Sequence, residues 1–109
     1  MPRRVTPETA VKHEIKRWLG LFGWRCWYNL QGLGAYKGIP DIEAIKQVNG
    51  RSVTLYIEVK SERGVQSPAQ KGFQDMIEQQ GGHYILARSI FDLEKYLIEK
   101  EIERNRRLL

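Results

Sequence analysis

The chain has few of the residues on which several common functions depend. Its one cysteine, Cys26, excludes an internal disulfide and a cysteine-based zinc site. The two histidines, His13 and His83, are far apart in the sequence, so a histidine-based zinc site is not expected either. No apolar run is long enough to span a membrane, and the first residues lack the apolar core of a signal peptide. We therefore expect a cytoplasmic protein with no membrane partner.

Length and composition predict a single globular domain that spans residues 1–109. Hydrophobic residues make up 41% of the chain and charged residues 28%, which is an ordinary globular composition and not that of a disordered protein. The net charge of +5 and the isoelectric point of about 9.5 favour a polyanionic partner such as nucleic acid.

The dipeptide Asn-Gly at positions 49 and 50 predicts a β-hairpin with a two-residue type I′ turn, because both turn residues need a positive φ. In that register Val48 pairs with Arg51, and counting back along both strands brings Asp41 opposite Glu58. Opposed side chains lie about 4.5–5.5 Å apart at Cβ, where two carboxylates repel each other. A hard divalent cation such as Mg²⁺ or Mn²⁺ would turn this repulsion into a binding site.

The second strand of the hairpin adds a lysine to the two acids. Because side chains alternate between the faces of a strand, Lys60 lies on the same face as Glu58, and Val59 lies on the opposite face with the other apolar residues. Lys60 therefore emerges beside the acids. It can serve a reaction there, or it can form a salt bridge with Glu58 or Glu62.

Two helices carry polar residues beside their apolar stripes. A helix over residues 7–20, with Thr6 as its N-cap, has Glu14 next to the stripe, either paired with a nearby cation or serving a function. A second helix begins after Ser67, and Gln70 stands where a capping box requires it. Gln70 also shares a face with apolar residues, so its amide can instead point inward.

The aromatic stretch from Trp24 to Leu30 is predicted to be a strand, either interior or covered by a partner, with Trp27 and Tyr28 in the core. The glycine-rich loop 31–38 matches no phosphate-binding motif. It is either a flexible connection or a substrate-contacting loop, with Lys37 meeting phosphate and Tyr36 meeting a sugar or base; its place just before Asp41 favours contact.

The C-terminal third is predicted to contain a strand over residues 83–88 and a last helix with a second capping box, formed by Ser89 and Asp92. Residues 103–107 are expected to fray. The order of elements is therefore α-β-β-β-α-β-α. The helix between the third and fourth strands makes a crossover, which predicts parallel pairing there and a mixed four-stranded sheet flanked by helices.

Pro40-Asp41 followed by Glu58-Val59-Lys60 forms a PD-(D/E)xK signature. Together with the glycine-rich loop, the SPAQ helix start and the Gly-Gly helix end, it resembles the VRR-NUC family of virus-type replication and repair nucleases. The resemblance runs from about Thr6 to Leu97 and implies an α/β restriction-endonuclease-like core.

The resemblance also implies roles for individual residues. Asp41, Glu58 and the backbone carbonyl of Val59 match the ligands of a Mg²⁺ or Mn²⁺ ion, and Lys60 matches the catalytic lysine. Glu14 matches an acid on the first helix that supports the metal through water, and Gln70 matches a catalytic glutamine. Expected nucleic-acid contacts are Tyr36, Lys37 and Arg63.

The function that this family implies is metal-dependent, structure-selective cleavage of phosphodiester bonds in DNA, on Holliday junctions or other branched DNA, in phage replication or repair. A flap or nicking nuclease, or a non-catalytic DNA-binding module with the same fold, is the alternative. Short stand-alone relatives resemble junction resolvases, which implies a homodimer acting in the host cytoplasm with no small-molecule cofactor.

Overall fold

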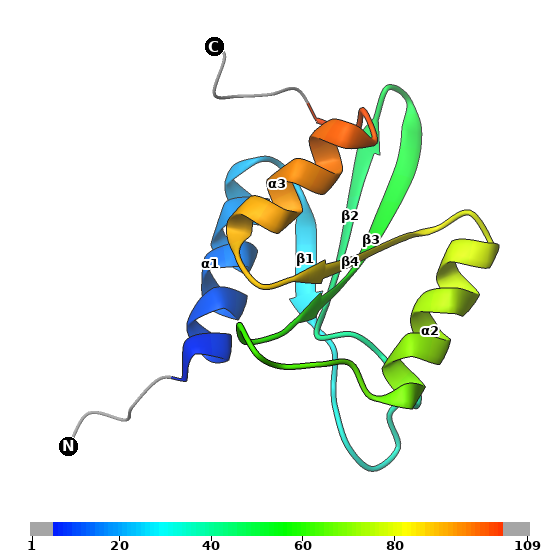
Figure 1. Cartoon of the computed structure of the whole chain (residues 1–109). Helices are drawn as coiled ribbons and strands as arrows, with labels where there is room; N and C mark the ends of the chain where they lie inside the picture. The colour runs from blue at the N-terminus through cyan, green and yellow to red at the C-terminus, as the bar shows by residue number, and fades with distance from the viewer. Residues whose placement is uncertain (1–5, 104–109) are drawn as a thin grey trace.

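The computed structural model describes residues 6–103, which form three helices and four strands around one mixed sheet (Figure 1). The elements in chain order are α1 (Pro7–Leu21), β1 (Arg25–Tyr28), β2 (Ile42–Val48), β3 (Arg51–Val59), α2 (Pro68–Gln79), β4 (His83–Ala87) and α3 (Ile90–Glu99). The predicted order α-β-β-β-α-β-α is confirmed. None of the helices in the described part of the chain has the length and apolar character needed to cross a membrane.

The hairpin has the register that its turn predicts. Val48 pairs with Arg51, and the antiparallel pairing continues to Ile42 opposite Ile57. Asn49 and Gly50 have φ values of 52° and 79°, as a type I′ turn requires. Strand β4 then pairs with β3 in parallel, so the crossover through α2 is also as predicted.

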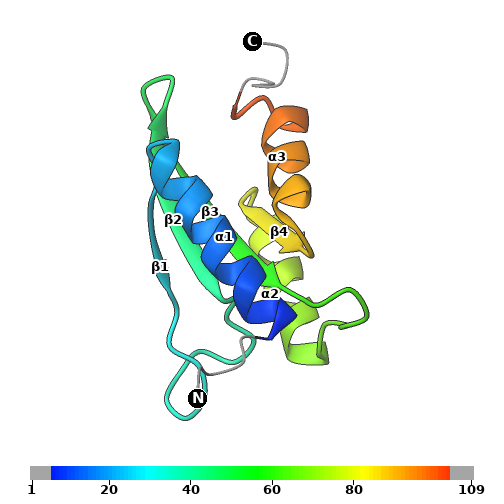
Figure 2. The same cartoon turned by 90° about the vertical axis from the view of Figure 1, so that its left-hand side faces the viewer.

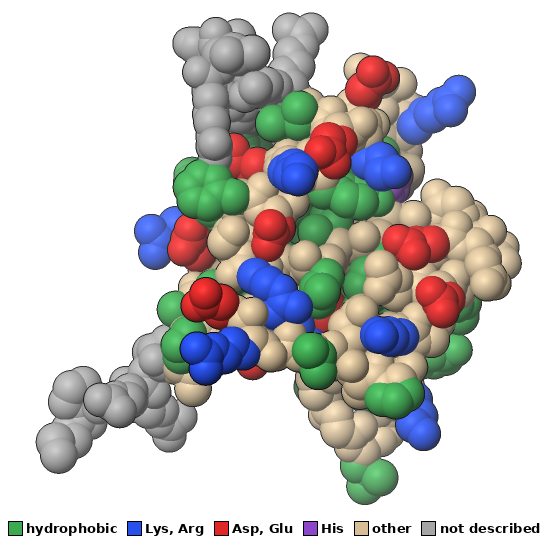
Figure 3. All heavy atoms as spheres, in the orientation of Figure 1, with side chains coloured by type: hydrophobic (Ala, Val, Ile, Leu, Met, Phe, Trp, Pro, Cys, Tyr) green, Lys and Arg blue, Asp and Glu red, His purple; other side chains and the backbone are tan. Residues whose placement is uncertain are grey.

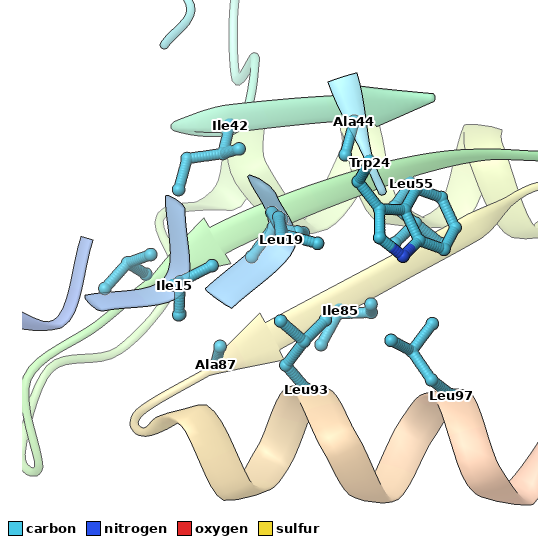
Figure 4. Packing of buried hydrophobic residues seen from close by; sticks show 12 residues of the cluster. Ile15, Leu19, Trp24, Ile42, Ala44, Leu55, Ile85, Ala87, Leu93 and Leu97 are labelled. Carbon is cyan, nitrogen blue, oxygen red and sulfur yellow. The ribbon is translucent and has the colours of Figure 1, made fainter. Parts of the chain in front are cut away.

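Helices cover the two faces of the sheet unequally. Helices α1 and α3 contact each other and pack on one face, whereas α2 lies apart from them on the other side of the molecule (Figure 1). The main core lies under α1 and α3, where Ile15, Leu19, Leu93 and Leu97 meet apolar residues of β2, β3 and β4 (Figure 4). On the other face, Phe73 of α2 packs against the rings of Tyr56 and Tyr84.

Of the two alternatives predicted for β1, an interior strand or a strand covered by a partner, the first is wrong. The sheet order is β1-β2-β3-β4, so β1 is an edge strand and not an interior one (Figure 2). The prediction that Trp27 and Tyr28 belong to the core is wrong, because their exposed fractions are 43% and 42%. The physical reason is that no element among residues 6–103 pairs with the free edge of this strand, and the contacts of His13 and Lys16 of α1 with the Tyr28 ring leave that ring partly exposed.

All three helices begin after the predicted N-cap residue, Thr6, Ser67 or Ser89. Thr6 caps α1, and Ser67 and Gln70 form the complete capping box of α2. The second capping box is wrong: Ser89 makes no side-chain cap, and the Asp92 carboxylate accepts instead from the backbone N–H of Arg88 at 2.8 Å.

The predicted fraying after α3 is wrong at its first residue. The Glu103 carboxylate accepts from the Trp24 indole N–H and pairs with the Lys46 ammonium at 2.8 Å. The rest of the predicted frayed segment, residues 104–107, lies outside the described residues.

Candidate active site

Asp41 lies at the start of β2 and is held by neighbouring strands on both sides. Its backbone carbonyl accepts from the N–H of Asn29, just beyond β1. Its Oδ2 accepts from the backbone N–H of Val59, at the end of β3, at 2.8 Å. The Lys12 ammonium of α1 lies 3.3 Å from the other oxygen, Oδ1. The carboxylate is therefore fixed in a largely buried position, with an exposed fraction of 9%.

Glu58 lies beside Asp41 and is more deeply buried, with an exposed fraction of 1%. The pKa of Glu58 is raised to about 9, chiefly by burial and further by a hydrogen bond with Asp41 and the charge of Asp41, against the lowering effect of Lys60 and Lys12. Its Oε1 is buried without a hydrogen-bond partner among the described residues. An unsatisfied buried carboxyl oxygen is costly, and a carboxyl group held protonated beside a carboxylate has little structural use. Both features fit a site built for a cation.

The donor set at this point suits a hard cation. Two carboxyl groups converge where β2 begins and β3 ends, and the Val59 carbonyl belongs to the same strand end. Oxygen ligands of this kind are those that Mg²⁺ and Mn²⁺ prefer, with water completing the coordination. Within residues 6–103 no group of three or more His, Cys, Asp or Glu side chains is arranged to hold a metal.

Lys60 comes two residues after Glu58, directly after the end of β3, and its backbone is held by β4. Its backbone N–H donates to the carbonyl of Ala87 at 3.1 Å. Lys60 forms no salt bridge within the described region, so the predicted pairing with Glu58 or Glu62 is not found there. A Cβ built on Gly64 would lie 3.5 Å from the Lys60 Cδ, so the loop passes directly over the lysine stem.

The loop over Lys60 is fixed by Arg88, the residue that directly follows β4. The Arg88 guanidinium donates to three backbone carbonyls of the loop, those of Ser61, Glu62 and Gly64, the last at 2.7 Å. Because these carbonyls precede and follow Arg63, the loop conformation depends on one side chain from another strand. Arg63 itself is exposed, as a nucleic-acid contact requires.

The two further residues that the family resemblance implied are not brought to the acids directly. Glu14 is exposed on α1, and its carboxylate makes no hydrogen bond or ion pair with any described residue. The Gln70 Oε1 accepts from the backbone N–H of Ser67 at 2.9 Å, so its carboxamide belongs to the capping box. Catalytic roles for both residues stay predictions.

The predicted contact loop borders a groove against α2. Tyr36 and Lys37 line it on one side and Phe73 and Met76 on the other, and its volume is about 840 Å³. The Tyr36 ring lies edge-on to Phe73 with ring centroids 5.7 Å apart. Gly38 makes this close approach feasible, because a Cβ there would lie 2.2 Å from the carbonyl oxygen of Ala69.

Positive charge is distributed unevenly along the chain. On the face seen in Figure 3, Lys and Arg side chains are interspersed with Asp and Glu, so that face has no patch of a single sign. Of the 18 basic residues, five arginines lie outside residues 6–103, which leaves 13 basic against 13 acidic residues within them. The excess positive charge therefore belongs to the two ends of the sequence, at Arg3, Arg4, Arg104, Arg106 and Arg107.

Sequence reasoning missed two residues, Lys12 and Arg88. Lys12 stands three positions before the buried Ile15, on the same face of α1, and this spacing was the available signal. Arg88 offered no signal, because its carbonyl partners come from a loop more than twenty residues earlier.

The fold and this constellation define the class of protein. A mixed sheet between helices, with two acids at neighbouring strand ends and a lysine two residues after the second acid, is the core of a PD-(D/E)xK nuclease. The model of the VRR-NUC domain matches residues 5–90. The chain therefore belongs to the VRR-NUC family, a family of nuclease-type DNA-processing domains.

A solved structure described as a VRR_NUC domain supports the same assignment. It is 25% identical in sequence, with a TM-score of 0.70 over 87% of this chain and 97% of the other. The comparison with curated proteins found no match.

Proposed function

We propose that this protein is a metal-dependent, structure-selective endonuclease that hydrolyses phosphodiester bonds in branched DNA such as a Holliday junction. The observation that carries the proposal is the buried pair of Asp41 and Glu58, in which Glu58 has an unsatisfied oxygen and a pKa raised to about 9 by burial. Such a pair is unfavourable for folding alone and suits the binding of Mg²⁺ or Mn²⁺.

The residues of the chain divide the work of hydrolysis. Asp41, Glu58 and the Val59 carbonyl would hold the ion, which when bound polarises the scissile phosphate and lowers the pKa of a coordinated water. Lys60, fixed beneath the loop at Gly64, orients the attacking water or stabilises negative charge on the phosphate. Tyr36, Lys37 and Arg63 contact the DNA around the cut, where phosphate contacts set position and the aromatic ring meets a sugar or base.

A cleavage assay on a labelled four-way junction tests the assignment. The wild-type protein should cut the junction with Mg²⁺ or Mn²⁺ and leave it intact in chelator. Asp41→Ala and Lys60→Ala should each lower the rate by at least about a hundredfold, because each removes a group that acts on the reacting atoms. Asp75→Ala and Lys95→Ala are the matched controls, since both residues are exposed on helices away from the acid pair.

A comparison of two variants separates the capping role of Gln70 from its proposed catalytic role. Ser67→Ala and Gln70→Ala each break the same capping box, so they should cost similar stability. A catalytic role for Gln70 predicts a much larger loss of cleavage in Gln70→Ala than in Ser67→Ala. Equal losses would assign Gln70 to the cap alone. For Glu14, a water-mediated role predicts weaker Mn²⁺ binding in Glu14→Gln.

We also propose that the active form is a homodimer joined along the free edge of β1. That edge carries the exposed rings of Trp27 and Tyr28, and a symmetric dimer would present two sites to a four-way junction. Light scattering should give twice the mass of one chain, and Trp27→Glu should give a folded monomer.

The substrate panel separates this function from its rivals. Flaps, nicked duplexes and plain duplexes are compared with the junction at equal metal concentration. Faster cleavage of flaps would indicate a flap nuclease, and equal rates on every substrate would contradict structure selectivity. Tight junction binding without cleavage in any divalent metal would indicate a DNA-binding module that has kept the nuclease fold.

A further inference from the structure

The ion pair between Lys12 and Asp41 lies where a bound cation would be expected. The Lys12 ammonium is 3.3 Å from the Asp41 Oδ1, and within residues 6–103 this is the one salt bridge that either site acid makes. The other oxygen of Asp41 is already engaged by the Val59 N–H at 2.8 Å. A metal ion that binds Asp41 on its accessible side therefore meets the ammonium first.

The ammonium and a divalent ion cannot share this oxygen favourably. Both are cations, and at contact distances in a largely buried site their repulsion is weakly screened. The ammonium is the group that can move, because it ends a flexible four-carbon stem, whereas Asp41 is fixed by the strand. The Lys12 side chain is 29% exposed, so it has an outlet to solvent.

We propose that Lys12 is a built-in counter-ion that holds Asp41 in the metal-free protein, is displaced by the entering divalent ion, and then binds a phosphate of the DNA backbone at the mouth of the site. The second part rests on the proposed nuclease function. The first part concerns only the protein and the ion.

If Lys12 is displaced by the metal, removing its charge should strengthen Mn²⁺ binding, whereas removing a residue that supports the metal should weaken it. Lys12→Met keeps most of the apolar stem and removes the competing charge, so Mn²⁺ should bind this variant on the order of tenfold more tightly than wild type. The matched control is Lys16→Met, one turn along α1, where the ammonium lies over the Tyr28 ring and not at an acid of the site. It makes the same change of net charge and should alter Mn²⁺ affinity less than about twofold.

Isothermal titration calorimetry of the DNA-free proteins with MnCl₂ measures both affinities. Tighter binding in Lys12→Met but not in Lys16→Met supports the proposal. Unchanged or weaker binding in Lys12→Met overturns it, as does an equal gain in both variants, because that gain would reflect net charge alone.

Thermal unfolding supplies a second readout that a purely structural lysine would not give. In chelator, Lys12→Met should melt about 5 °C below wild type, because Asp41 loses its counter-ion. With saturating Mn²⁺ the difference should disappear, since the wild-type protein has then also lost the ion pair. A difference that persists unchanged in Mn²⁺ would mean that Lys12 stays on Asp41, which overturns displacement.

The DNA step is measured by the fluorescence anisotropy of a labelled junction bound in the presence of Ca²⁺. Lys12→Met should bind the junction several-fold more weakly than Lys16→Met, and equal binding overturns the phosphate contact. Displacement of Lys12 and nuclease activity can each be absent without the other. If the wild-type protein binds Mn²⁺ competitively with Lys12 but cuts no DNA, the nuclease proposal fails and displacement stands. If it cuts DNA while Lys12→Met binds Mn²⁺ like wild type, the reverse holds.

Discussion

Replacing Glu58 by glutamine separates the effect of Glu58 on the stability of the fold from its role in metal binding. In the folded, metal-free protein burial and the neighbouring Asp41 together raise the pKa of Glu58 from 4.5 to about 9. Between these values the folded chain keeps a proton that the unfolded chain releases. Stability is therefore greatest below pH 4.5 and falls as the pH rises towards 9. Glutamine has no such proton and can still donate to Asp41 through its amide.

The size of the effect follows from the linkage between proton binding and stability. One proton corresponds to a slope of at most about 1.4 kcal/mol per pH unit across this window. At about pH 7.5, three units above the ordinary pKa, the wild-type protein should be destabilised by up to about 4 kcal/mol relative to a site that stays neutral. Glu58→Gln should be more stable than wild type by a large part of that amount, and should bind Mn²⁺ poorly.

Urea denaturation in chelator, from about pH 5 to pH 9, measures the difference directly. The free energy of unfolding of wild type should decline relative to that of Glu58→Gln across the range. The control is Glu62→Gln, at an exposed position of the next loop, whose curve should run parallel to that of wild type. Parallel curves for wild type and Glu58→Gln would refute the reasoning, because Glu58 would then ionise alike in the folded and unfolded chains.

Three further substitutions test the parts of the fold that position the site. Gly38→Ala places a Cβ 2.2 Å from the Ala69 carbonyl oxygen at a φ of +83°, so it should cost about 2 kcal/mol or more in urea denaturation and lower cleavage. Ser67→Ala removes an N-cap and should cost about 1 kcal/mol, seen as a lower melting temperature. Arg88→Met removes the donor to the carbonyls of loop 61–64; it should slow cleavage, and proteolysis within that loop should become faster. A proteolysis rate equal to that of wild type would contradict the role of Arg88.

The hairpin is the part of the site that sequence determined most fully. The positive φ values at Asn49 and Gly50 are a local requirement of the turn, and the two-residue turn then fixes every pair back to Ile42 opposite Ile57. The juxtaposition of Asp41 and Glu58 follows from that register. The α2 capping box is equally local, since its donors and acceptors lie within four residues of one another.

The family assignment also came from sequence, because the spacing of Pro40-Asp41 and Glu58-Val59-Lys60 and its flanking elements are linear features. Glu14 and Gln70 were assigned to the predicted site because of that resemblance. Local geometry could not test them, and the structure shows Glu14 exposed and Gln70 engaged in its cap.

Tertiary structure decided what depends on residues distant in the chain. The exposure of Trp27 and Tyr28 follows from the edge position of β1, and the order of strands in a sheet is not encoded in the pattern of one strand. The salt bridge between Lys12 and Asp41 depends on how α1 crosses the strand ends. Local pattern therefore determined which groups form the acid pair, because turn and strand geometry act over a few residues. Only packing decided which cation meets that pair, because helix placement is set by burial across the whole core.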